Sequence, residues 1–257
     1  MGEILIIKTG HCETFCEFED RGICSLGDVL RSSFLLNYFR DYKVTWVTDA
    51  KAISLFQDLD VEAIDWESWE SIDQSKFERI INLEKKGILL ESDFEGINSS
   101  SLSRVREIST LNNISYQERL CLLLGLEWER QPYSFRLSKQ VGNGVGLNWK
   151  VGEKFPQKML EKSFWLQLEQ SLSAEKVVKW QEGFDNLNEY IDWIDSLETL
   201  ITLDSLGLHI GIALNKKVIA LFGPTNIQDI YIHDKGVKLD IRNQDSSSII
   251  SKIREHL

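Results

Sequence analysis

Short apolar runs alternate with amphipathic segments along the 257 residues of the chain. The apolar runs are as long as a strand and contain few polar residues, which is typical of strands buried on both faces of a parallel sheet. The amphipathic segments repeat their apolar residues every three or four positions, as helices with one buried face do. This alternation predicts an α/β fold built on parallel sheets.

The pattern divides into two halves at a polar, glycine-bearing stretch around 138–144, which is typical of a linker. In the first half, strands are expected at 3–8, 43–48 and 79–82, and helices at 26–40 and 116–124. In the second half, strands are expected at 145–148, 176–180, 199–203 and 217–222, and helices at 161–172, 187–194, 205–214 and from about 246. The sequence therefore predicts two α/β domains, residues 1–137 and 138–257.

Acidic residues outnumber basic ones, with 40 Asp and Glu against 29 Lys and Arg and a formal charge of −11. Such an excess argues against nucleic acid as a partner and against an anionic membrane surface. Residues 1–137 contain 24 acidic and 15 basic residues, a net charge of −9, and residues 138–257 contain 16 and 14, a net charge of −2. An anionic ligand therefore meets less repulsion in the second half.

The start of the chain and its cysteines indicate a compartment. The first residues lack a basic segment and a cleavage site of the secretory kind, and no run of about 18 apolar residues occurs, so no transmembrane segment is expected. The chain has four cysteines, too few for a disulfide framework in a protein of this length. We expect a cytoplasmic protein.

The segment 202–209 is the strongest candidate for a ligand site. A predicted strand ends at Asp204 and Ser205, and the next helix begins there, so its backbone N–H groups favour an anion such as a diphosphate. His209 lies four residues after Ser205, on the same helix face. The alternative is structural: Asp204 or Ser205 caps the helix, and His209 packs in a crevice.

Two further strand ends carry candidate ligand groups. Gly223, Pro224 and Thr225 follow the next predicted strand, at the edge where ligands of open α/β sheets bind, although Gly-Pro is also a common turn. The strand at 145–148 ends in a loop with two lysines, Lys150 and Lys154, which place cations where a phosphate could bind. The alternative for these lysines is that they are solvated loop residues.

The segment 25–31 in the first half also admits two interpretations. Ser25 and Asp28, three residues apart at the start of a predicted helix, match a capping box. Alternatively, Asp28 is a carboxylate that the helix dipole keeps ionised, which suits a general base. The two interpretations are compatible with one another.

Three cysteines and a histidine precede this helix: His11, Cys12, Cys16 and Cys24. These residue types can form a tetrahedral zinc site, but structural zinc sites have closely paired ligands, and the spacing here is not of that kind. We favour a surface loop without a metal ion, and the zinc site is the alternative.

Taken in order, these segments resemble glycosyltransferase family 9, the heptosyltransferase-like enzymes of bacteria. The resemblance covers nearly the whole chain: the first strand ILIIK, the helix start Ser25–Leu30 (SLGDVL), the loop with Lys154-Phe155-Pro156, and the D-S-x-x-x-H and KKVIALFGPT motifs. The last two are the most specific part.

The resemblance implies a GT-B architecture, in which two Rossmann-like domains with mostly parallel sheets face a central cleft. It implies an inverting, metal-independent glycosyltransferase that moves a sugar, possibly a heptose, from a nucleotide-diphospho-sugar to an acceptor hydroxyl, with no cofactor. Asp28 then resembles the general base. The implied donor-binding residues are Asn148, Lys154, Glu182, Asp204, Ser205, Gly207, Leu208, His209, Gly223, Pro224 and Thr225. The implied acceptor-side residues are His11, Ser25 and Gly27.

Three departures from the family pattern open an alternative. A segment at 11–24 intrudes where the family has a short turn, Leu206-Gly207 replaces a usual Gly-Pro, and the chain is short for the family. The alternative is a degenerate, non-catalytic protein that binds a nucleotide or sugar, or a partner subunit. The charge of −9 on the half that the resemblance assigns to the acceptor favours a neutral or cationic acceptor over a phosphorylated lipopolysaccharide.

Overall fold

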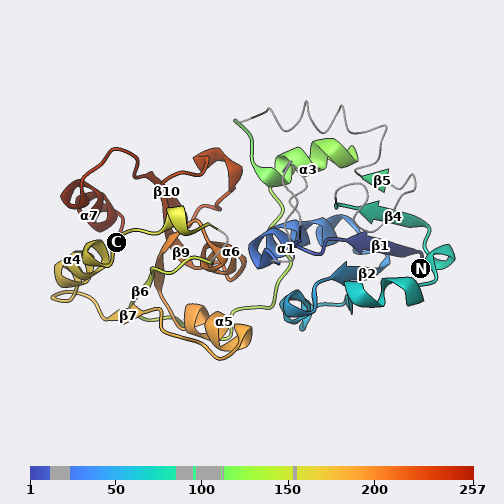
Figure 1. The fold of residues 1–257 in the computed structure, drawn as a ribbon, viewed down its shortest axis with the longest axis horizontal. Helices are drawn as coiled ribbons and strands as arrows, with labels where there is room; N and C mark the ends of the chain where they lie inside the picture. Colours follow the sequence, from blue (N-terminus) through green and yellow to red (C-terminus); the bar gives the residue numbers. More distant parts are fainter. Residues whose placement is uncertain (12–23, 85–94, 97–110, 112, 153–154) are drawn as a thin grey trace. The chain divides into compact units, whose positions relative to one another are not determined.

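The computed structural model describes residues 1–11, 24–84, 95–96, 111, 113–152 and 155–257. The chain folds into two compact units, Met1–Arg136 and Leu137–Leu257, shown in Figure 1. The boundary lies one residue before the expected one. Both units are α/β with parallel sheets, so the predicted fold class is confirmed.

The sheet of the first unit contains five parallel strands in the order β3-β2-β1-β4-β5. The strands are β1 (Glu3–Ile7), β2 (Lys43–Thr48), β3 (Glu62–Asp65), β4 (Arg79–Asn82) and β5 (Glu95–Gly96). After β3 the chain returns to the other side of β1, so the topological switch point of this sheet lies between β1 and β4.

The helices of the first unit differ in part from those expected. The expected helix 26–40 is an α-helix only over α1 (Leu26–Ser32) and continues as a 3₁₀ helix, η1 (Ser33–Tyr38). The change occurs where the Ser32 hydroxyl donates to the carbonyl of Asp28, 2.8 Å away, a bond that competes with regular helical geometry. α3 (Tyr116–Leu124) has the predicted bounds and ends at Gly125, whose φ of 70° is the left-handed conformation of a C-cap.

Short 3₁₀ segments make most of the remaining connections: η2 (Ala50–Phe56), η3 (Trp66–Ser71) and η4 (Gln74–Lys76). Leu5, Ile7 and Val47 form a fully buried cluster of the sheet, and Trp66 and Trp69 of η3 pack against it. These two tryptophans therefore contribute to the core of the first unit.

The sheet of the second unit also has five parallel strands, in the order β10-β9-β8-β6-β7. The strands are β6 (Val145–Asn148), β7 (Val178–Trp180), β8 (Thr199–Leu203), β9 (Lys217–Phe222) and β10 (Gly236–Asp240). Because β7 and β8 lie on opposite sides of β6, the switch point of this sheet lies between β6 and β8.

Helices cover both faces of this second sheet (Figure 1). They are α4 (Lys162–Leu172), α5 (Leu187–Asp195), α6 (Leu206–Ala213) and α7 (Ser246–Glu255), with 3₁₀ turns η5 (Pro156–Lys158) and η6 (Ile227–Asp229). On one face, α4 and α7 enclose a core with alternate residues of the strands, among them Leu147, Ile201 and Leu221. On the other face α6 packs closely on the sheet, since a Cβ on Gly211 would lie 2.8 Å from Leu200.

None of the helices in the described ranges is both long enough and apolar enough to cross a bilayer.

Candidate functional site

Asn148 is the centre of a polar network at the switch point of the second unit. It is the last residue of β6, is fully buried, and donates from Nδ2 to Thr202 Oγ1 on the neighbouring β8 at 2.7 Å and to Ser205 Oγ at 3.0 Å. Its Oδ1 accepts a 2.6 Å hydrogen bond from the hydroxyl of Tyr190 on α5. With both ends of the amide engaged, Asn148 joins β6, β8, α5 and the start of α6.

The N-terminus of α6 is seated directly on this network. A Cβ on Gly207 would lie 2.4 Å from both Asn148 Nδ2 and the Tyr190 hydroxyl, so only glycine permits the helix to approach this closely. Ser205 occupies the N-cap position but makes no side-chain capping bond, because its Oγ receives Asn148. Ser205 is therefore the N-cap residue, as the structural alternative expected, but it caps the helix without a side-chain hydrogen bond. The start of an eight-residue helix points out of the carboxyl edge of the sheet, where its dipole favours an anion.

Asp204 lies one residue before this helix start and forms an ion pair with Lys158 of η5, Nζ to Oδ2 2.7 Å. Burial acts to raise the pKa of Asp204, but the charges of Lys158 and of His209 outweigh it and hold the pKa below its usual value. The carboxylate is therefore ionised at neutral pH. His209 is 5 % exposed and lies on the first turns of α6, where the spacing predicted it.

The loop after β9 follows the same edge of the sheet. Gly223, Pro224 and Thr225 follow Phe222, the last residue of β9, and the Thr225 hydroxyl oxygen is buried. Farther along, Lys238 of the edge strand β10 donates to the carbonyls of Ile227 and Ile230, at 2.8 and 3.1 Å, and so braces the loop.

The remaining donor-side predictions have different outcomes. Leu208 is fully buried, so only its backbone can contact a ligand. Glu182 is exposed, two residues beyond the end of β7. Lys154 lies outside the described residues, and the lysine that the structure brings to Asp204 is Lys158.

The switch point of the first unit also carries polar side chains at strand ends. Thr9, which follows β1, donates from its backbone N–H and its hydroxyl to Oε1 of Glu84, at 2.5 and 3.0 Å, and Glu84 follows β4. Gly10 comes next and adopts a φ of 83°, and its carbonyl accepts from the N–H of Ser25 at 2.8 Å. A Cβ on Gly10 would come within 2.9 Å of Cys24 and Val29, so glycine lets β1 approach the start of α1.

Asp28 lies in the first turn of α1, just after Ser25 and Gly27, and is 5 % exposed. Its Oδ1 accepts from the Arg31 guanidinium at 2.6 Å, one helical turn later. Ser25 occupies the N-cap position but makes no side-chain capping bond, so the capping box expected from Ser25 and Asp28 is not formed. Asp28 is instead one half of a buried ion pair.

His11 is 9 % exposed and faces the end of β2. Its Nε2 lies 2.7 Å from Asp49 Oδ2, and its ring meets Trp66 edge to face, with centroids 5.0 Å apart. Burial acts to raise the pKa of Asp49, but hydrogen bonds from His11 and from the backbone of Lys51 lower it below its usual value. His11 is thus committed to a carboxylate at the same edge of the sheet.

Only two of the four residues of the zinc alternative, His11 and Cys24, are among those that the structure describes. Cys12 and Cys16 lie outside them, whereas the Cys24 thiol donates to the carbonyl of Thr9 at 3.4 Å. Burial, followed by the charge of Asp49, raises the pKa of Cys24 to about 12, which disfavours the thiolate that a metal requires. Among the residues that the structure describes, no three His, Cys, Asp or Glu side chains are grouped as a metal site.

Sequence reasoning assigned no role to four residues of these networks: Lys158 and Tyr190, which lie outside the candidate segments, and Thr202 and Arg31, which lie within them. The first three are brought to Asp204 or Asn148 by the sheet, across 42 to 54 residues of chain. For Arg31 a local signal existed, because an acid and a base three residues apart on a helix are neighbours.

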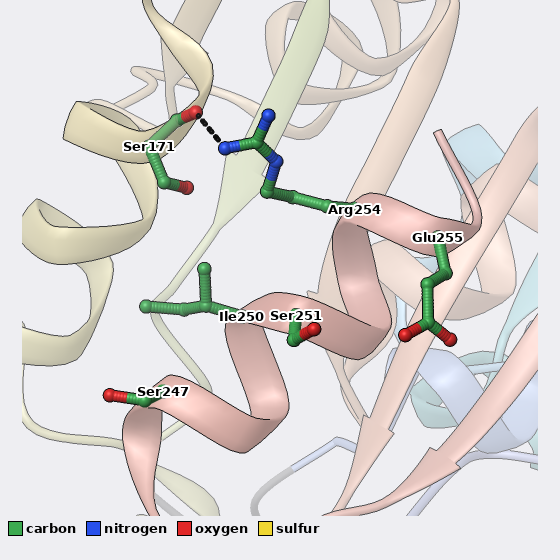
Figure 2. Close-up of a pocket in the computed structure, with 6 residues that line it drawn as sticks. All are labelled: Ser171, Ser247, Ile250, Ser251, Arg254 and Glu255. Atoms are coloured by element: carbon green, nitrogen blue, oxygen red, sulfur yellow. Dashed lines mark hydrogen bonds between the residues drawn. The ribbon is translucent and has the colours of Figure 1, made fainter.

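A separate open hollow lies between α4 and α7 (Figure 2). Three serines, Ile250, Arg254 and Glu255 line it, and Arg254 donates to the carbonyl of Ser171 at 3.2 Å and pairs with Glu175 at 3.0 Å. Both partners of that ion pair are half-exposed, which makes it energetically weak. None of the predicted site residues lines this hollow.

Comparison with known families finds a match for part of the chain. Residues 183–240 match the family model described as glycosyltransferase family 9 (heptosyltransferase), a region that includes β8, α6 and β9. No curated protein matches the chain in sequence.

Solved structures of low sequence identity share its fold. Escherichia coli heptosyltransferase WaaC with ADP-2-deoxy-2-fluoro heptose is 13 % identical, with a TM-score of 0.62, and the match covers 99 % of this chain and 100 % of WaaC. The E. coli ADP-heptose lps heptosyltransferase II is 14 % identical, with a TM-score of 0.67 and coverage of 100 % and 98 %. The dodecameric glycosyltransferase TibC from enterotoxigenic E. coli, described as iron-containing, is 12 % identical, with a TM-score of 0.62 and coverage of 96 % and 66 %.

Proposed function

We propose that the chain is a member of glycosyltransferase family 9 that transfers a sugar from a nucleotide-diphospho-sugar to an acceptor hydroxyl with inversion at the anomeric carbon. Relatives of the same fold hold ADP or an ADP-heptose compound in their solved structures. ADP-heptose is therefore the first donor to test.

The observation that supports the donor half is the arrangement around the start of α6. Asn148, Tyr190 and Gly207 hold the helix N-terminus at the β6/β8 switch point, and Lys158 stands 2.7 Å from Asp204 beside it. The helix N-terminus carries a partial positive charge and the lysine a full one, and both suit the phosphates of a nucleoside diphosphate. They stabilise the negative charge that grows on the leaving diphosphate, so the proposal includes no metal ion.

The observation that supports the acceptor half is Asp28, a buried and paired carboxylate. In the proposed reaction it accepts the proton of the acceptor hydroxyl as the hydroxyl oxygen bonds to the anomeric carbon. The bond from that carbon to the diphosphate oxygen breaks in the same step, and the nucleoside diphosphate departs with the electron pair. One displacement inverts the anomeric carbon. His11, Ser25 and Gly27, near the same end of the first sheet, are the proposed acceptor-side residues.

The experiment measures release of ADP from ADP-heptose, with water as acceptor and then with a panel of sugar acceptors. Removing a general base costs about 10²- to 10⁴-fold in rate, so Asp28→Asn is expected to lower kcat by about 10³-fold. The matched control is Asp41→Asn, an exposed aspartate of the same unit, which is expected to leave the rate unchanged.

Two results would contradict the proposal. A near-normal rate in Asp28→Asn rules out Asp28 as the base. Calorimetric binding of ADP-heptose with no turnover on water or any acceptor would instead support the non-catalytic alternative.

A further inference from the structure

The partner of Asp28 is itself held by a second buried contact. The Arg31 guanidinium, which binds Asp28 Oδ1 at 2.6 Å, lies over the ring of Tyr116 on α3, 3.7 Å from its centroid. A guanidinium stacked at this distance on an aromatic face is both attracted to it and oriented by it. Two contacts in different directions leave Arg31 little freedom to turn.

The contacts return to Asp28 through the neighbouring residue. The Tyr116 hydroxyl lies 3.1 Å from Ser32 Oγ, and Ser32 Oγ donates to the backbone carbonyl of Asp28 at 2.8 Å. Asp28, Arg31, Ser32 and Tyr116 thus form a closed ring of contacts, and each of the four is at most 8 % exposed. The ring connects α1 to α3 at the one carboxylate to which we assign chemistry.

Stability is a weak reason for such a pair. The loss of hydration on burying two charges cancels most of the attraction between them, and an apolar pair of similar volume is often as stable. The ring instead does what a general base requires, because it fixes the orientation of the carboxylate relative to the reacting hydroxyl.

We propose that Arg31, held against Tyr116, is a positioning residue that orients the Asp28 carboxylate by binding Oδ1 and directs Oδ2 toward the acceptor hydroxyl. This inference rests on the proposed function, since it assigns Arg31 a role through Asp28. Arg31 acts on the orientation of the base and not on the binding of the donor.

The kinetic test compares Arg31 variants in ADP release from ADP-heptose. A misplacement of about 1 Å can cost about 10²-fold, so Arg31→Ala is expected to lower kcat by about that factor and to leave KM for ADP-heptose unchanged. Free guanidinium ion should restore part of the rate of Arg31→Ala, and Arg31→Lys should retain more activity than Arg31→Ala, since its ammonium replaces the charge without the planar fork. Arg40→Ala, at an exposed arginine two residues beyond the end of η1, is the control and is expected to match the wild type.

A spectroscopic test is independent of turnover. The ring predicts a guanidinium whose side-chain N–H signals in the ¹⁵N NMR spectrum of the full-length protein are protected from exchange, and Asp28→Asn and Tyr116→Leu should both remove that protection. A wild-type protein without protected Arg31 signals would overturn the inference, whatever the activity.

The two proposals fail in different ways. Normal kcat in Arg31→Ala, while Asp28→Asn is inactive, refutes the positioning role and leaves Asp28 as the base. An equal loss in Arg31→Ala and Arg31→Lys with no recovery by guanidinium points to a merely structural role and also refutes it. Normal kcat in Asp28→Asn refutes the proposed function, and the NMR signals then still decide whether the ring exists.

Discussion

Single residues set the geometry at both strand-end sites, and Gly207 is the sharpest case. Its missing side chain lets α6 rest on Asn148 and Tyr190, which are hydrogen bonded to each other. Burial raises the pKa of Tyr190 above its usual value, so its hydroxyl keeps its proton and remains the donor of that bond. The network therefore persists across the whole neutral pH range.

Gly207→Ala is expected to destabilise the protein by about 1–3 kcal/mol, because the new methyl group would overlap two buried polar atoms. Alanine favours a helix over glycine by about 1 kcal/mol in a helix interior, and less at the second position of α6, so the clash outweighs this gain. Urea unfolding measures the change. Gly183→Ala, where a Cβ meets nothing within 4 Å, is the control; a Gly207→Ala protein as stable as this control would contradict the packing argument.

At the scale of elements, a buried ion pair ties the segment that begins the second unit to its body. Lys216, just before β9, pairs with Asp195 at the end of α5, Nζ to Oδ1 2.9 Å. Asp195 also accepts hydrogen bonds from the Ser138 hydroxyl and from the N–H of Lys139, the latter at 2.8 Å. Burial acts to raise the pKa of Asp195, but Lys216, Ser138 and Lys139 outweigh it, so the pKa lies below its usual value.

Lys216→Met is expected to cost about 3–5 kcal/mol at neutral pH, because it leaves the Asp195 carboxylate buried without its cation. Since the folded-state pKa of Asp195 is lowered, its stabilisation is present above the unfolded pKa of about 4 and is lost as the pH falls below that value. As the pH is lowered through about 4, the free energy of unfolding of Asp195→Asn should therefore fall less steeply than that of the wild type. Lys235→Met, at an exposed lysine, serves as control; equal losses in Lys216→Met and Lys235→Met would refute the anchoring role.

The strands of the two sheets differ in how clearly the sequence pattern predicts them. The central strands β1, β2, β6, β8 and β9 were predicted because burial on both faces makes their sequences almost wholly apolar. β3 and β10 are edge strands whose residues are mostly half-buried, with charged residues such as Glu62, Lys238 and Asp240, and β5 has only two residues, so none shows an apolar run. The division of the expected 26–40 helix depended on one side-chain hydrogen bond from Ser32, which hydrophobic periodicity does not report.

For the whole molecule, the uneven charge of the two halves leads to a prediction about the acceptor. With −9 on residues 1–137 and −2 on residues 138–257, a phosphorylated acceptor meets repulsion in the half to which we assign acceptor binding. We propose that the acceptor is neutral or cationic.

A matched pair of sugar acceptors, one with a phosphate and one without, tests this. The acceptor without phosphate is expected to have the lower KM at low salt, and the gap should narrow at roughly 0.5 M salt, where the screening length is only a few ångströms. Steady-state kinetics on both acceptors at two salt concentrations provide the comparison. A lower KM for the phosphorylated acceptor at low salt would contradict the charge argument.

Local features of the chain were enough to indicate its fold class, its division into two halves and a resemblance to a family whose model matches residues 183–240. Apolar strands, the D-S-x-x-x-H motif and the Ser25–Asp28 segment are continuous in the sequence, so each can be recognised without knowledge of the fold. The partners of those residues were decided only by the tertiary structure. Parallel sheets bring strand ends together across tens of residues, and in this way Lys158 contacts Asp204 and Tyr190 contacts Asn148. No pattern in the sequence predicts these contacts. Burial then fixes the orientation of these side chains, because a polar group removed from water must stay hydrogen bonded to the partner available to it.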